Sequence, residues 1–202
     1  MPSLPPTLAF DGVALDLMTV PVGAKFGRIH LKTFPGPLGF GKNPSRFSDP
    51  RRRTEDNRFG VLYLGSSLKV CFLETMLRDD RDGIVGQIEI TETELDDRRY
   101  AEIRVRRALR LVDLTGDGPV RMGIPSDVAR GRRQGLARKW SVAFHEHPQQ
   151  PDGIVYPSRL NGETNLAIYG RAIGNLELLR EQDLKRAAGL PNVLDDFFVA
   201  LL

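Results

Sequence analysis

The stretch VLYLGSSLKVCFLETMLR, residues 61–78, contains the clearest change from strand to helix in this sequence. Residues 61–64 (VLYL) form an apolar run typical of a strand, and residues 65–67 (GSS) interrupt it. Over residues 68–78 the apolar positions recur with helical spacing, and a serine is the expected N-cap. This stretch therefore predicts a strand, a turn of small residues and a helix, in that order.

A single carboxylate, Glu74, lies among the apolar residues of this predicted helix. It shares a stripe with Val70, Leu73 and Leu77. One interpretation is an exposed i,i+4 ion pair with Arg78, which stabilises a helix by a few tenths of a kcal/mol. The other is a carboxylate that faces a polar cleft, where such groups must be hydrogen-bonded or paired and are often functional. The helix alone favours the first interpretation, so the rest of the chain has to decide.

The composition is that of an ordinary globular domain. The chain has 202 residues, of which 41% are hydrophobic and 27% are charged, and its formal net charge is only +3. One core and one domain over residues 1–202 are the expectation. No apolar run approaches the roughly 18 residues of a membrane span, and the first residues do not resemble a secretory signal. A single cysteine, Cys71, excludes an intrachain disulfide, and a cytoplasmic location is expected.

The remaining segments predict a mixed α and β chain, with a core over about residues 25–170. Strands are expected at residues 13–20, 25–32, 84–91, 109–114, 154–156 and 166–169, and helices from residues 125–127 onward and at residues 134–145. Two C-terminal helices are expected within residues 176–202, one ending near Gly189 and the other carrying Phe197 and Phe198. A long segment rich in Pro, Gly, Ser and Arg occupies residues 33–57, and loops of this length are often functional.

Several familiar motifs are incomplete. Residues 36–42 (GPLGFGK) fit the frame of a phosphate-binding loop, but Asn43 replaces the hydroxyl residue and Pro44 follows it. His145 and His147 have no further ligand to complete a zinc site, so no metal is expected. The serines of residues 65–67 have no nucleophile-elbow frame. Nucleotide triphosphatases, zinc enzymes and serine hydrolases are therefore disfavoured.

Clustered arginines leave a second class of function open. Residues 51–53 and 130–133 could contact the phosphates of a nucleic acid in a non-enzymatic binding module. The small net charge and the lack of an aromatic-basic motif make direct nucleic-acid binding a weak expectation. A third possibility is an interaction protein that uses the predicted helix around Phe197 and Phe198.

Polar residues at the edges of the apolar segments form an ordered series. The series runs through GRIH (27–30), SRFS (45–48), VLYLGSS (61–67), FLET (72–75), PS (157–158) and TNL (164–166). In this order and context the sequence resembles the RES domain, a family named for an arginine, a glutamate and a serine.

This resemblance implies a fold, an activity and a partner. The fold would be similar to that of ADP-ribosyltransferases, with a mixed, mainly antiparallel sheet flanked by helices in one α+β domain. The activity would be degradation of NAD+ by cleavage of the nicotinamide–ribose bond, with NAD+ as substrate and no further cofactor. The protein would be the toxin of a bacterial toxin–antitoxin pair, neutralised by a helix-turn-helix antitoxin of the Xre type. Transfer of ADP-ribose to a protein target is the alternative reaction.

The resemblance also assigns roles to charged residues. Cleavage of the glycosidic bond builds positive charge on the ribose, and the Glu74 carboxylate would stabilise that charge in the transition state. Arg28 and Arg46 would bind the pyrophosphate. Arg58, in NRFG (57–60), competes with Arg46 as the family arginine, and the SRFS context favours Arg46.

Three uncharged residues complete the expected site. Tyr63 would present its face to the nicotinamide ring or ribose, although an ordinary strand aromatic is the alternative. Ser158 would hydrogen-bond the nicotinamide amide or the ribose, although a turn serine after Pro157 is the alternative. Asn165 is expected to support the site by fixing its loop.

Overall fold

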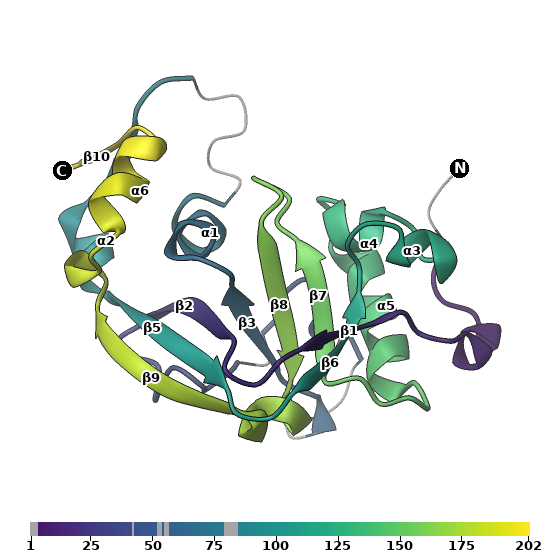
Figure 1. Cartoon of the computed structure of the whole chain (residues 1–202). Helices are drawn as coiled ribbons and strands as arrows, with labels where there is room; N and C mark the ends of the chain where they lie inside the picture. Colours follow the sequence, from purple (N-terminus) through teal and green to yellow (C-terminus); the bar gives the residue numbers. More distant parts are fainter. Residues whose placement is uncertain (1–3, 42, 52–53, 55–56, 79–84) are drawn as a thin grey trace.

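Figure 1 shows the computed structural model of the protein, which describes residues 4–41, 43–51, 54, 57–78 and 85–202. One domain is built on an eight-stranded sheet that is curled into a half-barrel and flanked by helices, an α+β fold as expected. In spatial order the strands are β1 (Leu17–Val20), β6 (Leu109–Asp113), β7 (Gly153–Pro157), β8 (Thr164–Tyr169), β3 (Val61–Gly65), β2 (Lys25–Leu31), β5 (Arg98–Val105) and β9 (Leu176–Asp183). Strands β6 and β7 pair in parallel, and the other pairs in this sheet are antiparallel.

Short helices and a small second sheet surround these strands. The helices are α1 (Leu68–Phe72), which continues as a π-helical segment over Leu73–Leu77, then α2 (Glu92–Asp96), α3 (Gly118–Arg121), α4 (Asp127–Arg130), α5 (Gly135–Glu146) and α6 (Leu190–Asp196). Short 3₁₀ helices cover Leu8–Gly12, Gly170–Asn175 and Leu184–Arg186. Strands β4 (Ile88–Ile90) and β10 (Val199–Leu201) pair in parallel outside the main sheet.

Helices α1 and α5 pack on the same face of the main sheet. Along β3, Val61 packs in the cluster that contains Phe144 of α5, while Gly65 lies directly beneath α1. Residues two apart on a strand point to the same side. Leu62 and Leu64 point to the other side and pack in a separate core cluster. The space between α1 and α5 on this face is where the candidate site lies.

The predicted helix start is confirmed. Ser67 has extended backbone angles, and its hydroxyl accepts a hydrogen bond from the Val70 amide at 3.1 Å. This is the N-cap interaction that ends a strand and begins a helix within three residues. Most other predicted elements are also present, although β1 begins at Leu17 rather than Val13, and β4 covers only Ile88–Ile90; Ile84 lies outside the described residues.

The prediction of two helices in residues 176–202 is wrong in its first half. Residues Leu176–Asp183 (LELLREQD) form strand β9, which pairs antiparallel with β5 at the edge of the sheet. Leu, Glu, Arg and Gln are good helix formers, but helix propensity is a weak preference, and backbone pairing with β5 outweighs it. Ion pairs between the two strands add to it, including Arg180–Glu102 at 2.7 Å and Arg104–Glu177.

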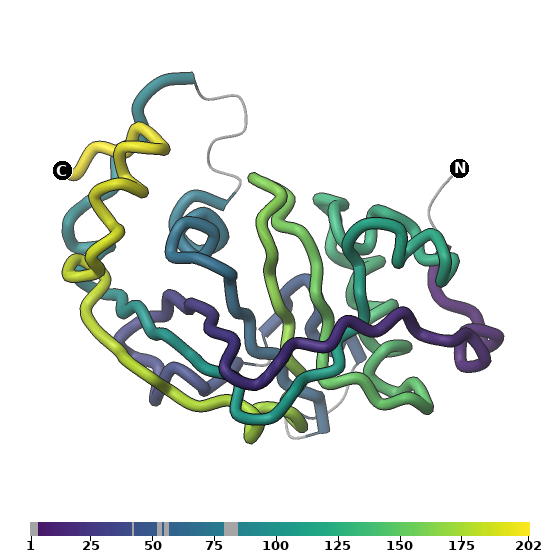
Figure 2. Tube along the Cα trace, in the orientation of Figure 1, coloured from purple at the N-terminus to yellow at the C-terminus, as the bar shows by residue number. Residues whose placement is uncertain are grey.

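The second half of that prediction is partly correct. A helix is present, α6, but it ends at Asp196, before Phe197 and Phe198, which were expected to lie on it. Phe198 has a φ of 53°, a left-handed conformation that a helix cannot continue. The chain then forms β10. In Figure 2 these C-terminal residues lie at the opposite end of the molecule from residues 4–12. Among the described helices, none is long and apolar enough to cross a bilayer.

Candidate active site

The floor of the site is a row of residues that oppose one another across four strands. Gly27 of β2 is paired with Gly65 of β3, Gly65 with Asn165 of β8, and Asn165 with Tyr156 of β7. Opposed residues in neighbouring strands place their side chains on the same face. The row therefore has two residues without side chains at one end and two polar side chains at the other.

The two glycines let α1 lie close to the sheet. A Cβ at Gly65 would fall 2.6 Å from Val70 Cγ1 and 2.7 Å from Cys71 Sγ, and a Cβ at Gly27 would fall 2.7 Å from the Tyr100 ring. Such distances are shorter than any contact between carbon atoms in a packed core. A larger residue at Gly65 would lift the helix that carries Glu74 away from the row, and one at Gly27 would displace the Tyr100 ring and press on Cys71 Sγ at 3.1 Å.

The helix then widens into a π turn. The Arg78 amide donates to the Leu73 carbonyl at 2.6 Å, an i→i+5 hydrogen bond, and Arg78 itself has a φ of 38°. Turns of this kind are rare and are frequent at functional sites. Cys71, Glu74 and Thr75 from this helix line the cavity beside it.

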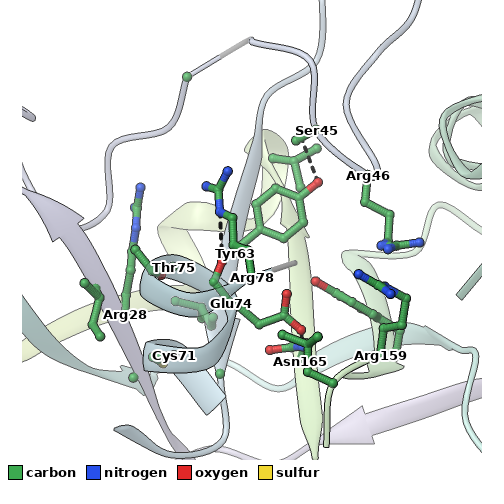
Figure 3. Close-up of a pocket in the computed structure, with 18 of the residues that line it drawn as sticks. Arg28, Ser45, Arg46, Tyr63, Cys71, Glu74, Thr75, Arg78, Arg159 and Asn165 are labelled. Atoms are coloured by element: carbon green, nitrogen blue, oxygen red, sulfur yellow. Dashed lines mark hydrogen bonds between the residues drawn. The ribbon is translucent and has the colours of Figure 1, made fainter. Parts of the chain in front are cut away.

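The Glu74 carboxylate is held from the sheet. Asn165, which is buried, donates from its side-chain amide to Glu74 Oε1 at 3.0 Å, as Figure 3 shows. Arg78 instead donates from Nε to the backbone carbonyl of Glu74 at 3.2 Å. Among the described residues no ion pair joins the Glu74 and Arg78 side chains. The carboxylate therefore faces the cleft, which was the second of the two interpretations.

The cavity has a volume of about 470 Å³ and an excess of positive charge. Four arginines and one carboxylate are among its lining residues: Arg28, Arg46, Arg78, Arg159 and Glu74. Its walls also include the rings of Tyr63 and Tyr156. A volume of this size is in the range of small-molecule sites. Guanidinium groups around a single carboxylate suit an anionic ligand, phosphate groups above all.

Arg28 enters the cavity where β2 and β3 separate. Its Nη1 donates to the carbonyls of Pro37 and Gly39, at 2.6 Å and 2.5 Å, and its guanidinium lies 5.8 Å from the centre of the Phe34 ring. Burial lowers the pKa of Arg28 to about 10, so it stays charged at neutral pH. Arg28 thus fixes the 34–39 loop over the cavity while it lines the wall.

Arg46 is positioned by a loop that Tyr63 anchors. The Tyr63 hydroxyl accepts from the Phe47 amide at 2.8 Å and is 2.9 Å from the Ser45 hydroxyl. Arg46 Nη1 donates to the Gly131 carbonyl at 2.7 Å, at the start of the segment that leads into α5. Burial raises the pKa of Tyr63, so its hydroxyl remains protonated. Tyr63 therefore connects the strand before Glu74 to the loop that carries Arg46.

Comparison with known protein families identifies the family of this chain. The model of the RES domain matches residues 23–188, most of the chain. The chain belongs to the RES domain family. A curated relative, the probable toxin y4kH of Sinorhizobium fredii (strain NBRC 101917 / NGR234), is 36% identical over 127 residues, which are 62% of this chain and all of the relative.

A solved structure has the same fold as this RES domain. It is the MbcT–MbcA toxin–antitoxin complex of M. tuberculosis, of which one chain matches with a TM-score of 0.60 and 18% sequence identity. The match covers 89% of this chain and 91% of the other. At this level of identity the match shows a shared fold and no more.

The two residues that competed as the family arginine lie in different places. Arg46 lines the cavity with Glu74, whereas Arg58 lines a separate, more open hollow together with Phe59 and His145. Arg58 donates from Nε to the Arg51 carbonyl at 3.2 Å. The structure thus brings Arg28, Arg46, Tyr63, Glu74 and Asn165 together and leaves Arg58 outside.

Ser158 of this RES domain is not among the residues that line the cavity. It is buried, its hydroxyl accepts from the Leu160 amide at 3.2 Å, and its own amide donates to the Glu163 carbonyl at 2.6 Å. These bonds form the turn that places Arg159 and Leu160 on the cavity wall. The position fits the alternative of a turn serine, whose effect on the site passes through its neighbours.

Sequence reasoning missed several lining residues, among them Tyr156, Thr75 and Arg159. Tyr156 lies in GIVYP, where every residue is buried, so alternation gives no sign of the face it occupies. Thr75 follows Glu74 in the π-helical segment Leu73–Leu77, and from there it lines the cavity. Arg159 directly follows Ser158, and its position in a turn between two strand-like segments was the one available signal.

The incomplete motifs remain without a catalytic role. His145 stacks on Phe59 with ring centroids 4.2 Å apart, and burial lowers its pKa to about 4. Within the part of the chain that the structure describes, no three His, Cys, Asp or Glu side chains form a metal cluster. Burial raises the pKa of Cys71 to about 12, which keeps its thiol protonated. Lys42 of the phosphate-loop frame lies outside the described residues.

Proposed function

We propose that this RES domain binds NAD+ in the cavity and cleaves the bond between nicotinamide and ribose. The observation that supports the proposal most is the Glu74 carboxylate, held by Asn165 at the floor of an arginine-lined cavity. A carboxylate beneath a ribose stabilises the positive charge that develops as the glycosidic bond breaks. The arginines around it are suited to the pyrophosphate of the same molecule.

The reaction is a transfer of the ADP-ribosyl group to an oxygen nucleophile. The bond between ribose C1′ and nicotinamide N1 breaks, and its electron pair leaves with N1, so nicotinamide departs as a neutral molecule. A new bond forms between C1′ and the acceptor oxygen. With water the products are ADP-ribose and a proton, and with phosphate the product is a 1-phosphorylated ADP-ribose. Glu74 would stabilise the cationic sugar between the two bonds.

The acceptor of the ADP-ribosyl group determines which reaction the protein catalyses. Water makes the protein a glycohydrolase, phosphate makes it a phosphorylase, and a protein side chain makes it an ADP-ribosyltransferase. Incubating the purified protein with NAD+, with and without phosphate, and separating the products by chromatography distinguishes the first two. The third requires radiolabelled or affinity-tagged NAD+ and a cell extract, in which label would be transferred to protein.

A toxin function extends this proposal to the cell. It is supported by the relative whose name is probable toxin y4kH and by the fold shared with one chain of a toxin–antitoxin complex. The toxin–antitoxin complex supports an antitoxin as the partner, and we propose that this antitoxin is of the helix-turn-helix, Xre type. Expression of the protein alone should deplete NAD+ and slow growth.

The decisive control is Glu74→Gln, which keeps the shape and an oxygen that can accept from the Asn165 amide but removes the charge. We expect nicotinamide release to fall by about 100-fold or more, because the variant loses charge stabilisation that is specific to the transition state. No release by the unsubstituted protein under any condition would overturn the enzymatic proposal. Full activity of the variant would leave the enzyme and remove Glu74 from its centre.

A further inference from the structure

Tyr156 has the features of a residue held ready for a ligand. It stands on β7 opposite Asn165, the residue that holds Glu74, and it is 6% exposed. Its ring packs edge-on against Phe47, with centroids 4.9 Å apart and an interplanar angle of 71°. It lines the cavity together with Glu74. The ring is thus fixed by packing at the floor of the site.

Its hydroxyl differs from those of the neighbouring buried tyrosines. The Tyr63 hydroxyl accepts from the Phe47 amide, and the Tyr169 hydroxyl is bonded to Ser141. For Tyr156, no hydrogen bond to the hydroxyl is formed within the described residues. The hydroxyl is therefore open to the cavity that its side chain lines, where a ligand can supply the missing partner.

The hydroxyl is a donor in the relevant pH range. Burial is the main cause that raises the pKa of Tyr156 well above its ordinary value, and the nearby Glu74 carboxylate adds to the effect. The phenol therefore keeps its proton. The Glu74 carboxylate beside Asn165 is, when ionised, an acceptor only. One donor and one acceptor thus face the same part of the cavity.

This pair selects one kind of ligand group. A phosphate or a carbonyl oxygen only accepts hydrogen bonds, and it would be repelled by the carboxylate. A sugar hydroxyl both donates and accepts, so it can give its proton to Glu74 and receive one from Tyr156. We propose that Tyr156 contacts the substrate, and that its hydroxyl donates a hydrogen bond to the 2′-hydroxyl of the nicotinamide-bearing ribose while Glu74 accepts from that same group.

This inference rests on the proposed function and adds a substrate contact to it. Tyr156→Phe removes one oxygen and keeps the ring against Phe47. We expect kcat/KM for NAD+ to fall roughly 10- to 100-fold, the range for loss of a hydrogen bond within a buried site. With an NAD+ analogue that lacks the 2′-hydroxyl of the nicotinamide ribose, the same substitution should change kcat/KM by less than about twofold, because the contact is already missing.

A matched control is Tyr100→Phe, the same change on β5 at a half-buried tyrosine that does not line the cavity. Its kcat/KM should match that of the unsubstituted protein for both substrates. Thermal unfolding separates a structural role from a substrate contact. Since the Tyr156 hydroxyl has no partner among the described residues, Tyr156→Phe should leave Tm unchanged or raise it, whereas a structural hydroxyl would lower Tm.

Each result decides a different question. If the unsubstituted protein releases no nicotinamide, the proposed function fails and this contact fails with it. If it does release nicotinamide and Tyr156→Phe is as active, only the contact fails. An equal loss with NAD+ and with the 2′-deoxy analogue, or a lowered Tm, would likewise overturn it, because the hydroxyl would then act elsewhere than on that sugar oxygen.

Discussion

The side-chain amide of Asn165 donates a hydrogen bond to the Glu74 carboxylate, joining residues 91 positions apart in the sequence at 3.0 Å. Glu74 comes from a π turn and Asn165 from the central strand β8, so the bond fixes the helix to the sheet at the site itself. An amide is neutral, so it orients the carboxylate without neutralising its charge. That is the arrangement a carboxylate needs if it is to stabilise a cationic transition state.

Replacing this amide by a carboxylate tests that requirement. In Asn165→Asp, two carboxyl groups would lie about 3 Å apart, and like charges at that distance raise the pKa of one of them. We expect nicotinamide release to drop at neutral pH and to recover partly as pH rises, because Glu74 would regain its charge. A pH profile of kcat/KM measures this. A profile parallel to that of the unsubstituted protein would show that Asn165 does not govern the charge of Glu74.

Gly65→Ala should displace the helix that carries Glu74. The new Cβ would fall 2.6 Å from Val70 Cγ1 and 2.7 Å from Cys71 Sγ, both in the core. Overpacking of this kind destabilises a protein by about 1–3 kcal/mol. Chemical denaturation measures the loss, and activity should fall beyond what the fraction folded explains.

Gly174→Ala is the matched control, since nothing lies within 4 Å of its Cβ position. It should keep both stability and activity. If Gly65→Ala behaves in the same way as this control, the close approach of α1 to β3 is not needed for the site.

Tyr63→Phe should loosen the loop that carries Arg46. The substitution leaves the Phe47 amide without its acceptor and the Ser45 hydroxyl without its partner. A buried donor without a partner costs about 1–3 kcal/mol of stability. We expect a lowered Tm and a KM for NAD+ that rises more than kcat falls, because the loop positions a binding residue. A fall in kcat alone would instead place the Tyr63 hydroxyl in the chemical step.

Cys71 should make the protein less stable at high pH. Its pKa is about 12 in the folded protein and 9.0 by the ordinary value, so between these values the unfolded chain releases a proton that the folded protein retains. The stability that the protonated thiol provides is complete below about pH 9 and is lost as pH rises toward 12. Comparing Cys71→Ala with the unsubstituted protein isolates this contribution, because the buried tyrosines, which also titrate at high pH, titrate alike in the two proteins.

The pH dependence of the free energy of unfolding is the measurement. The difference between the two proteins should be constant below pH 9 and should shrink above it. A constant difference up to pH 11 would show that the thiol titrates equally in both states. Alkylation of Cys71 by iodoacetamide at pH 8 should be slow in the folded protein and fast after unfolding.

The elements that depend on short-range interactions could be predicted from the sequence. The strand, the capping serine and the helix of residues 61–78 follow from short-range periodicity and hydrogen bonding, which a reader of the chain can see. Strand β9 could not be predicted in this way, because Leu176–Asp183 has the composition of a helix and is a strand only through pairing with β5. Strand β5 was overlooked for a related reason, since its charged residues conceal the alternation of buried Ala101, Ile103 and Val105.

The site was predicted from an ordered set of residues along the chain. That order could indicate which residues belong to the site, but it could not indicate how they contact one another. Glu74, Arg28, Arg46, Tyr63 and Asn165 could be named from order and context, and they meet at one cavity. The partnership of Glu74 with Asn165 could not be read from the chain, because strand register and the π turn decide it. Tyr156 was missed because all five residues of its strand are buried and only the register across β8 places it beside the site.

The choice between the two candidate arginines gives a direct test of the cavity as the binding site. Arg46 lines it, whereas Arg58 lies in a separate hollow. Arg46→Ala should weaken NAD+ binding by about tenfold or more, the loss of one charge-assisted contact to a phosphate, and Arg58→Ala should leave binding unchanged. Calorimetric titration of NAD+ into Glu74→Gln backgrounds of both variants measures affinity without turnover.

Because phosphate contacts are screened by salt, the affinity of the Arg46 variant should also depend less steeply on ionic strength than that of the Arg58 variant. Weaker binding in Arg58→Ala with normal binding in Arg46→Ala would move the substrate out of the cavity and into the neighbouring hollow.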